Sequence, residues 1–581
     1  MKRTKIICTL GPATDSKKVL KNMILKGMNV ARINFSHGDY AQHQKMIDMV
    51  KEVREEMKMP VGILLDTKGP EIRIKDFENS SIILHKNDSF TLTTRDIIGN
   101  QNEVSITYKG LPDDIDKGNK IMIDDGLIEL KVVKVNGPDI ICEVINGGEV
   151  KNKKGVNVPG TKVKLPYLSE VDKKDLLFGI KNDIDFIAAS FVSDHSDIKT
   201  IRNFVNENGG DDIKIIAKIE NRDGVDNIMD IVRIADGIMI ARGDMGVEIP
   251  FEEIPGIQKD IIKKCYKLSK PVITATQMLD SMIRNPRPTR AEITDVANAV
   301  YDRTSAIMLS GETSIGSYPV EVVRVMAMIA EKAEEDIDYQ KKFRENFIKQ
   351  SDNVTNAIGY ATCSTAHSVS AAAIITVTKS GNTARTVSKY RPDCPIIATT
   401  INNKVYNQLS ISWGVTPLLT ELKSTTDELF EHAIKSSMDA KLIRSGDLVV
   451  ITGGTPINVR GTTNTMKVQV VGDVLIEGKG LNKLSSSGNV CVISKDGSGI
   501  RNFTAGNVLV ISSTTEKILH LIKNASALIT EEEFDNSESV IVGKAVDIPV
   551  IANAESAADI LKSGTLVTVN AKKGLVYSGI K

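Results

Sequence analysis

A lysine and a carboxylate two residues apart stand at the end of an otherwise apolar segment. The segment KIIAKIENRDG, residues 214–224, is apolar over several positions before it reaches Lys218 and Glu220. Because residues two apart in a strand point to the same side, both side chains should share one face near the strand's carboxyl end. They could form a partly buried ion pair that orients the next loop, or they could act together on a substrate. The surrounding sequence is needed to choose between these two interpretations.

Similar apolar runs recur between residues 5 and 340. The eight runs are KIICTLG, VARINFSH, VGILLDT, FIAASFV, KIIAKIE, GIMIARGD, PVITATQM and AIMLSGET. Each is continuously apolar, as expected for parallel strands covered on both faces, and most precede a helical pattern. We therefore predict an α/β fold built on a (β/α)8 TIM barrel, in which the chemistry lies at the carboxyl ends of the strands. The polar residues at those ends are Arg32, Asn34, Ser36, Asp66, Thr67, Lys218, Glu220, Arg242, Asp244 and Thr276.

Changes of pattern along the 581 residues predict four domains. The barrel comprises residues 1–69 and 167–340. Residues 70–166 alternate between strands and turns, which predicts an all-β domain inserted over the active face. This insert could be a lid that excludes water when it closes, or a passive addition. Residues 341–472 form an α/β regulatory domain, and a Gly/Ser-rich stretch introduces a small α/β tail domain of residues 473–581.

The composition restricts the class of protein. The 74 basic and 74 acidic residues balance to a formal net charge of zero, so neither nucleic acid nor an anionic membrane is the expected partner. Six scattered cysteines without a C-x-x-C pair indicate a reducing compartment rather than a disulfide or zinc framework. No apolar stretch has the length of a signal peptide core or a membrane span, and we expect a cytoplasmic protein.

The strand ends combine carboxylates with cations. Glu220 and Asp244 follow successive strands, and paired carboxylates with room for water and phosphate oxygens suit Mg²⁺ or Mn²⁺. Arg32 could hold a phosphate or carboxylate through two hydrogen bonds, and Lys218 could neutralise charge that develops on an oxygen. This combination favours phosphoryl transfer from an anionic substrate. A second set with oxygen ligands and one formal charge suits a monovalent cation: Asn34, Ser36, Asp66 and Thr67.

Seven motifs in order resemble those of the pyruvate kinase family. They are CTLGPAT, ARINFSHG, LDTKGPEIR, AKIEN, ARGDMGVEIP, TATQMLDSM and PRPTRAE, and the similarity extends over residues 1 to about 472. The resemblance implies that phosphoenolpyruvate and ADP are converted to pyruvate and ATP. It also implies Mg²⁺ (or Mn²⁺) and K⁺ as cofactors and a homotetrameric assembly.

The resemblance also implies a role for each of the polar residues. Arg32 would hold the transferring phosphoryl group, and Lys218 would stabilise both the transition state and the enolate. Glu220 and Asp244 would bind Mg²⁺, and Gly243, Asp244 and Thr276 would bind the substrate carboxylate, with Thr276 also helping to protonate the enolate. The K⁺ site would comprise Asn34, Ser36, Asp66 and Thr67. Arg73 and Lys154 would contact the nucleotide.

Two later segments resemble other parts of the family. TKSGNTAR is similar to the loop that binds sugar-phosphate effectors, although an ordinary capped helix start would also explain it. Its candidate residues are Thr378, Ser380, Gly381, Asn382 and Thr383, with Arg460 as a contact to a second anionic group. Whether the effector is a sugar phosphate or a nucleotide stays open.

The tail resembles the extra C-terminal domain of some bacterial members, which is similar to the phosphohistidine domain of phosphoenolpyruvate-utilising enzymes. In TEEEFDNSESVIVG, Glu533 and Phe534 replace two glycines of the motif and Glu538 replaces its histidine. A carboxylate cannot replace the imidazole that accepts phosphate there, so we expect a non-catalytic domain.

Two other classes of function stay open at this stage. A barrel lyase acting on a carbon–carbon bond next to pyruvate could use Lys218 as a Schiff base, or a metal-stabilised enolate. A metabolite sensor without catalysis is disfavoured, because every position discussed carries the residue type that catalysis needs.

Overall fold

The computed structural model describes residues 2–345, 353–454, 463–472, 474–533 and 537–579. By contact density the chain forms two compact units, residues 1–359 with 378–419 and residues 360–377 with 420–581. Every helix within these described ranges is too short or too polar to span a lipid bilayer.

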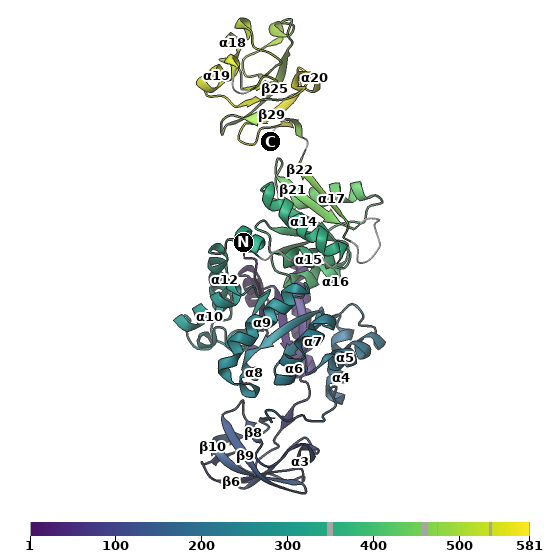
Figure 1. The fold of residues 1–581 in the computed structure, drawn as a ribbon, viewed down its shortest axis with the longest axis vertical. Helices are drawn as coiled ribbons and strands as arrows, with labels where there is room; N and C mark the ends of the chain where they lie inside the picture. The colour runs from purple at the N-terminus through teal and green to yellow at the C-terminus, as the bar shows by residue number, and fades with distance from the viewer. Residues whose placement is uncertain (1, 346–352, 455–462, 473, 534–536, 580–581) are drawn as a thin grey trace. The chain divides into compact units, whose positions relative to one another are not determined.

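The first unit contains the predicted barrel, which is confirmed. Eight parallel strands close in the order β1-β17-β16-β15-β14-β13-β3-β2. Helices surround this barrel (Figure 1). Their bounds are β1 Lys5–Thr9, β2 Val30–Asn34, β3 Gly62–Asp66, β13 Phe186–Ala189, β14 Lys214–Ile219, β15 Gly237–Ala241, β16 Val272–Ala275 and β17 Ala306–Leu309. Nearly every strand residue is buried, because side chains fill the barrel on one face and helices cover the other.

Helices follow the barrel strands and bury one face each against them. Their bounds are α1 Lys17–Leu25, α2 Tyr40–Met57, α4 Glu170–Lys181, α5 His195–Glu207, α6 Arg222–Asp226, α7 Ile228–Ile234, α8 Arg242–Glu248, α9 Ile254–Lys267, α10 Arg290–Tyr301, α11 Gly311–Ser314, α12 Pro319–Glu335 and α13 Tyr339–Glu345. Three of them begin with reciprocal capping: Ser169 and Asp172 cap α4, Asp194 and Asp197 cap α5, and Thr289 and Glu292 cap α10. These caps satisfy amide groups that the first helical turn leaves unpaired.

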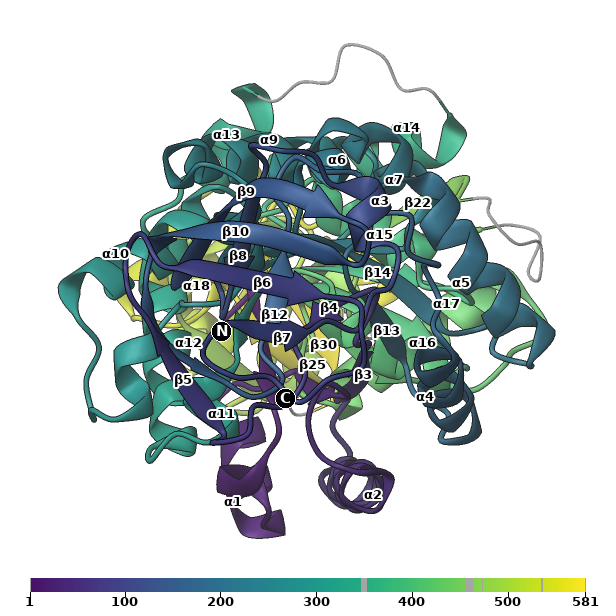
Figure 2. The same ribbon diagram turned by 90° about the horizontal axis from the view of Figure 1, so that it is seen from below.

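The chain leaves the barrel after β3 and forms an all-β insert before α4. A seven-stranded sheet has the order β4-β12-β8-β9-β10-β6-β7, and β5 pairs with β11 (Figure 2). The bounds are β4 Ile72–Arg73, β5 Ser81–Leu84, β6 Ser89–Thr93, β7 Glu103–Ser105, α3 Leu111–Asp114, β8 Lys120–Ile123, β9 Ile128–Asn136, β10 Asp139–Asn146, β11 Gly148–Lys151 and β12 Gly155–Asn157. The insert encloses a hydrophobic core of its own.

The last part of the first unit and the whole second unit are also α/β. In the first unit β19 pairs in parallel with β20, and the elements are α15 Asn382–Lys389, β19 Ile396–Thr400, α16 Asn403–Gln408 and β20 Val415–Leu419. In the second unit β21 pairs with β18 and β22, and the bounds are β18 Ala373–Val377, α17 Thr426–Asp439, β21 Leu448–Gly453 and β22 Thr465–Val470. Helix α14, Val354–Ser368, spans the boundary between the units.

Over its described residues, the tail forms an eight-stranded mixed sheet with three α-helices. The strand order is β23-β30-β29-β25-β26-β27-β28-β24. The bounds are β23 Val474–Glu477, β24 Lys479–Gly480, β25 Ser485–Ile493, β26 Val508–Ile511, α18 Glu516–Ile522, β27 Ala527–Thr530, α19 Glu538–Ala545, β28 Val550–Ala552, α20 Ala557–Ile560, β29 Leu566–Asn570 and β30 Leu575–Ser578. Its parallel centre, β25 to β28, accounts for the predicted α/β character of this segment.

Phe186 is the largest side chain inside the barrel and marks where its stability resides. It is 2% exposed and packs with Leu64, Ile216 and other residues that point inward. A Cβ atom at Gly62 would lie 2.8 Å from Cε2 of Phe186, so glycine at this position leaves room for the ring.

We expect Phe186→Ala to lower the free energy of unfolding of the barrel by about 3–5 kcal/mol, because a buried ring is replaced by a cavity. Urea unfolding followed by far-UV circular dichroism measures this. Phe251→Ala is the matched control, since the Phe251 side chain is 80% exposed and its removal should change stability by less than about 0.5 kcal/mol. Equal stability of the two variants would contradict the prediction.

Candidate active site

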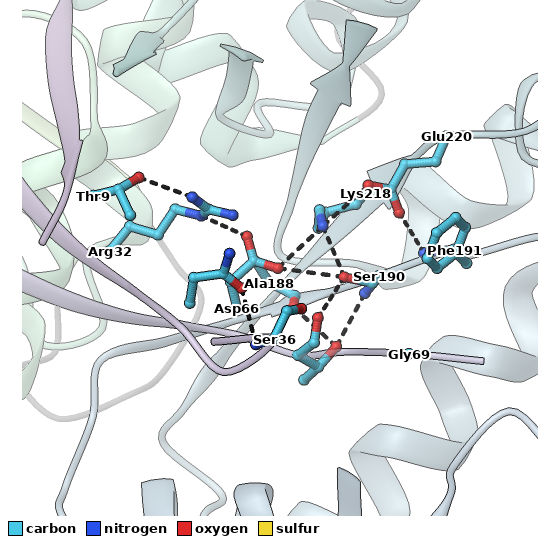
Figure 3. A network of polar contacts seen from close by, with 12 residues as sticks. Thr9, Arg32, Ser36, Asp66, Gly69, Ala188, Ser190, Phe191, Lys218 and Glu220 are labelled. Carbon is cyan, nitrogen blue, oxygen red and sulfur yellow. Dashed lines mark hydrogen bonds and ion pairs between the residues drawn. The ribbon is translucent and has the colours of Figure 1, made fainter. Parts of the chain in front are cut away.

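Asp66 joins two cations at the carboxyl ends of the barrel strands. Its Oδ2 accepts a hydrogen bond from Nε of Arg32 at 2.6 Å, and its Oδ1 accepts one from Nζ of Lys218 at 3.0 Å (Figure 3). Arg32 also donates from Nη1 to Oγ1 of Thr9 at 2.8 Å. Asp66, Arg32 and Lys218 are 1%, 9% and 8% exposed, so these charges interact in a largely dry environment.

Lys218 is surrounded by oxygen atoms from three strands. Its Nζ donates to Oγ of Ser190 at 2.7 Å and lies 3.0 Å from Oε1 of Glu220. Burial lowers the pKa of Lys218, but the carboxylates of Asp66, Glu220 and Asp244 outweigh burial and raise it above its ordinary value. The ammonium is therefore charged at neutral pH, which disfavours the Schiff-base lyase, since that chemistry requires a neutral amine.

Glu220 combines a satisfied oxygen with an unsatisfied one. Its Oε2 accepts a hydrogen bond from the backbone N–H of Phe191 at 2.6 Å. Its Oε1 is buried and has no hydrogen-bond partner among the described residues, and its one charged contact there is the 3.0 Å ion pair with Lys218. Burial raises the pKa of Glu220, Lys218 opposes this change and Asp244 adds to it. An unsatisfied carboxylate oxygen of this kind is suited to a cation.

Asp244 and Gly243 lie in the first turn of α8, beside Thr276. The backbone N–H of Gly243 donates to Oγ1 of Thr276 at 2.8 Å, and that hydroxyl donates to the carbonyl of Ala275 at 2.6 Å. Thr276 has a φ of 66°, a strained conformation for a β-branched residue. The preceding residue of the helix, Arg242, supports this turn through two 2.7 Å hydrogen bonds to the carboxylate of Asp295.

The carboxylates outnumber the cations at this site. Asp66, Glu220 and Asp244 act electrostatically on Lys218, and Arg32 is the second cation, so three negative groups meet two positive ones. When Glu220 is ionised, one net negative charge is left, which a metal cation could balance. Among the described residues no group of three or more His, Cys, Asp or Glu side chains is placed to hold a metal ion. Glu220 and Asp244 interact electrostatically, and their carboxylate oxygens are ligands of the kind that Mg²⁺ binds together with water and substrate oxygens.

The predicted monovalent-cation residues lie at neighbouring strand ends. Asn34 and Asp66 are directly paired in the register of β2 and β3, and Oδ1 of Asn34 accepts from the backbone N–H of Ser36 at 3.1 Å. The hydroxyl of Thr67 accepts from the N–H of Ser190 at 3.1 Å. Asp66 also forms ion pairs with Arg32 and Lys218. The only carboxylate of the predicted monovalent-cation site is therefore shared with these two side chains.

The predicted nucleotide residues lie on β4 of the insert and just before β12, with which β4 pairs. Arg73 is opposite Gly155 in the β4–β12 register and forms an ion pair with Glu71 at 2.8 Å. The Nζ of Lys154 lies 2.7 Å from Oδ1 of Asp124. Burial raises the pKa values of Glu71 and Asp125, and in both Asp244 contributes to the rise. The negative charge of Asp244 in the barrel site thus acts on the carboxylates of Glu71 and Asp125 in the insert.

The predicted effector residues form the turn that leads into α15 and include the first two residues of that helix. Oγ1 of Thr378 accepts from the N–H of Gly381 at 3.0 Å, and Gly381 has a φ of 81° that favours glycine. The residues of this turn are Thr378, Ser380, Gly381, Asn382 and Thr383. Arg460 lies outside the described residues.

In the tail, Glu538 is the first residue of α19, and Glu533 is exposed just before the segment that contains Phe534, which lies outside the described residues. The neighbouring carboxylate of Glu532 accepts hydrogen bonds from the N–H of Thr514 and from Oγ of Ser537.

Sequence reasoning missed two residues that complete the site, Ser190 and Phe191. Ser190 bonds to Lys218 and to the carbonyl of Thr67 at 2.7 Å, and Phe191 supplies the N–H that holds Glu220. Ser190 lies within the run FIAASFV, directly after β13, and carried the same signal as the other strand-end residues. Phe191 carried none, because it acts through its backbone at a φ of 56°.

Comparison with known proteins covers nearly the whole chain. Family models match as Pyruvate kinase, barrel domain over residues 1–323, Pyruvate kinase, alpha/beta domain over residues 356–469, and PEP-utilising enzyme, mobile domain over residues 503–574. The chain is 48% identical over 581 residues to a pyruvate kinase of Bacillus licheniformis, with 100% of this chain and 99% of the relative covered. It is 46% identical over 580 residues to one of Geobacillus stearothermophilus, with the same coverage.

Among solved structures, the crystal structure of a pyruvate kinase from Cryptosporidium parvum matches with a TM-score of 0.76 and 40% identity, covering 81% of this chain and 96% of that one. The seven ordered motifs, the closed barrel with its charged strand ends and these matches agree, and the chain belongs to the pyruvate kinase family.

Proposed function

We propose that this enzyme transfers the phosphoryl group of phosphoenolpyruvate to ADP, giving pyruvate and ATP. The observation that carries the proposal is the ammonium of Lys218, buried and held charged by Asp66, Ser190 and Glu220, with the guanidinium of Arg32 on the other side of Asp66. In the reaction the bond between phosphorus and the enol oxygen breaks, a bond from phosphorus to an ADP oxygen forms, and the enolate takes up a proton on carbon.

Lys218 contributes charge rather than a proton. Its raised pKa holds the proton on nitrogen, so the residue stabilises negative charge on the phosphoryl and enolate oxygens without giving the proton up. Arg32, with Nε committed to Asp66 and Nη1 to Thr9, presents its remaining N–H groups to the phosphoryl group.

Thr276 orients the substrate and is not itself the proton source. Its hydroxyl proton is directed at the carbonyl of Ala275, and its oxygen accepts from Gly243. We infer that a water molecule beside Thr276 protonates the enolate. Gly243, Asp244 and Thr276 would together face the substrate carboxylate.

Two cation sites fit the residues present. Pyruvate kinases use a divalent metal and potassium, and here Glu220 and Asp244 would hold Mg²⁺ or Mn²⁺, where the ion would neutralise phosphoryl oxygens when bound. The unsatisfied Oε1 of Glu220 supports this assignment. Asn34, Ser36, Asp66 and Thr67 would hold K⁺ through oxygen atoms at the ends of β2 and β3.

The nucleotide would approach from the insert. Arg73 lies on β4 and Lys154 lies just before β12, the strand that pairs with β4. Arg73 forms an ion pair with Glu71 and Lys154 with Asp124, so the phosphates of ADP would replace these carboxylates as partners. We infer that the insert is a lid that covers the barrel site. The charge of Asp244 in that site contributes to the raised pKa values of Glu71 and Asp125 in the insert.

The broader organisation follows from the same family. We propose a catalytic barrel of residues 1–69 and 167–340, a lid of 70–166, an effector-binding domain of 341–472 and a non-catalytic tail of 473–581, in a cytoplasmic homotetramer. A phosphorylated metabolite, sugar phosphate or nucleotide, would bind the Thr378–Thr383 turn and control activity, with Arg460 as a further contact.

Lys218→Met should lower kcat by at least about 10²-fold and change KM for phosphoenolpyruvate much less, because the lost charge acts on the transition state. A coupled assay of ATP formation with Mg²⁺ and K⁺ measures both constants. Lys199→Met, on the exposed face of α5, is the control and should match the wild type. A wild-type kcat in Lys218→Met, or a borohydride-trapped pyruvate adduct on Lys218 in the wild type, would refute the mechanism.

Glu220→Gln should weaken Mn²⁺ binding at least about tenfold, because the amide lacks the charge of the ligand. In the wild type the raised pKa of Glu220 means that protons leave as the metal binds, so affinity should rise from about pH 6 to about pH 8. Titration calorimetry in buffers of different ionisation enthalpy measures proton release and affinity. Glu252→Gln, an exposed carboxylate, is the control. Metal binding that is independent of pH and of Glu220 would contradict the site.

Ser380→Ala with Thr383→Val should abolish activation by whichever sugar phosphate or nucleotide activates the wild type, and leave basal kcat unchanged. Initial rates against a panel of these compounds, with and without K⁺, provide the measurement. Activation that survives in the double variant would place the effector elsewhere.

A further inference from the structure

A second charged pocket lies at the opposite end of the barrel strands from Lys218. It is lined by the last turn of α9, by Val272 at the start of β16, by Ser305 just before β17, and by residues of α15 and the segment after it. The space that it encloses, including the part open to solvent, is about 390 Å³. All of its lining residues belong to the first unit and none takes part in the proposed reaction.

The lining carries an unbalanced positive charge. Its charged residues are Lys270, Arg303, Arg385, Lys389 and Arg391, and no aspartate or glutamate lines it. Among the described residues, none of the ion pairs includes Lys270, Arg303, Arg385 or Arg391. The nearest carboxylate to act on Lys270 and Arg385 is Asp236, which Arg202 and Lys214 already hold.

Arg391 is the most confined of these cations. It is 6% exposed, and its guanidinium lies over the ring of Trp413 with Cζ 4.3 Å from the ring centroid. Only Nη2 donates hydrogen bonds, to the carbonyls of Arg303 at 2.7 Å and Thr304 at 3.1 Å. Burial and then the neighbouring Arg303 lower the pKa of Arg391 to about 9. An anion in the pocket would relieve both effects.

The other cations are held by neutral groups. Cζ of Arg303 lies 4.6 Å from the ring centroid of Tyr266, and Nζ of Lys270 donates to the carbonyl of Ala235 at 2.6 Å. Nη2 of Arg385 donates to the carbonyl of Ser380 at 2.9 Å. These contacts orient the cations without neutralising them.

Capping of helix ends explains part of this arrangement. Helices α9, α10 and α15 end near Ser269, Arg303 and Arg391, which have φ values of 57°, 76° and 52°, and cations stabilise the carbonyls at such ends. Capping accounts for one hydrogen-bonding cation at each end. It does not account for a cavity whose lining contains five cations, hydroxyls and no carboxylate.

We propose that this pocket binds a small organic phosphate, with the dianionic phosphate group held by Lys270, Arg303 and Arg391. Arginine and lysine together match a phosphate dianion in charge and in hydrogen-bond donors, and the serine hydroxyls of the lining could contact the rest of the molecule. None of the residues of the active site or of the Thr378–Thr383 turn lines this pocket, although the turn adjoins it through the hydrogen bond from Arg385 to Ser380. The inference does not depend on the role proposed for either site.

Trp413 makes the proposal directly measurable, because it is the only tryptophan of the chain and lies in the lining. We would titrate the full-length protein with glycerol 3-phosphate, inorganic phosphate and glycerol at constant ionic strength, and follow tryptophan emission and heat of binding. Glycerol 3-phosphate should give a saturable change, inorganic phosphate should bind at least about threefold more weakly, and glycerol should not bind.

Lys270→Met and Arg303→Met should each weaken binding of glycerol 3-phosphate at least about tenfold. Lys267→Met removes an equal charge from the same helix end outside the lining and should stay within about twofold of the wild type. These two cations are less buried than Arg391, so their loss should leave the fold intact, which circular dichroism checks. The response should persist in Lys218→Met and in Ser380→Ala, since neither residue lines this pocket.

Three results would overturn the proposal. The first is the absence of a saturable response to glycerol 3-phosphate. The second is an equal loss in Lys267→Met, which would indicate a diffuse electrostatic effect. The third is equal affinity for inorganic phosphate, which would show that the pocket holds a free anion and not an organic phosphate.

Discussion

The site is organised by one buried carboxylate shared between two cations. Without Asp66, the charges of Arg32 and Lys218 would repel each other in a dry environment, and removal of one partner from such a group is strongly destabilising. Burial alone would raise the pKa of Asp66, but Arg32 and Lys218 lower it below its ordinary value, so the carboxylate stays ionised. This fixed anion keeps both cations charged and leaves each with donors for a substrate.

The barrel supplies the geometry that this sharing needs. Arg32, Asp66 and Lys218 come from β2, β3 and β14, and the parallel register places Asn34 opposite Asp66. A slip of one residue would turn each side chain to the other face of its strand. Inward-pointing residues such as Phe186 and Met239 fill the interior below and hold the register. The residues that stabilise the barrel and the residues of the active site thus lie at different heights along the same strands.

The sequence was sufficient to predict the barrel strands and most of the charged residues of the active site. Continuous apolar runs located all eight barrel strands, and polar residues at their ends located Lys218, Glu220 and Asp66. What it did not predict depends on backbone geometry or on partners distant in sequence. Phe191 acts through its N–H, Thr276 has a φ of 66° that a threonine does not favour, and Arg73 is held by Glu71 beside the β4–β12 pairing. No residue type or spacing encodes these features.

The second pocket raises the question of whether its occupancy could reach the active site. Strand β16 begins at the pocket with Val272 and ends at Ala275, next to Thr276. It is buried and paired on both sides, with β15 and β17, so it cannot shift alone. A bound phosphate would change catalysis only if the pocket has two arrangements with different affinities, one of which favours the strained φ of Thr276. That strain is the feature of this strand end that a small displacement could relieve, and it makes Thr276 the residue at which such a coupling would act.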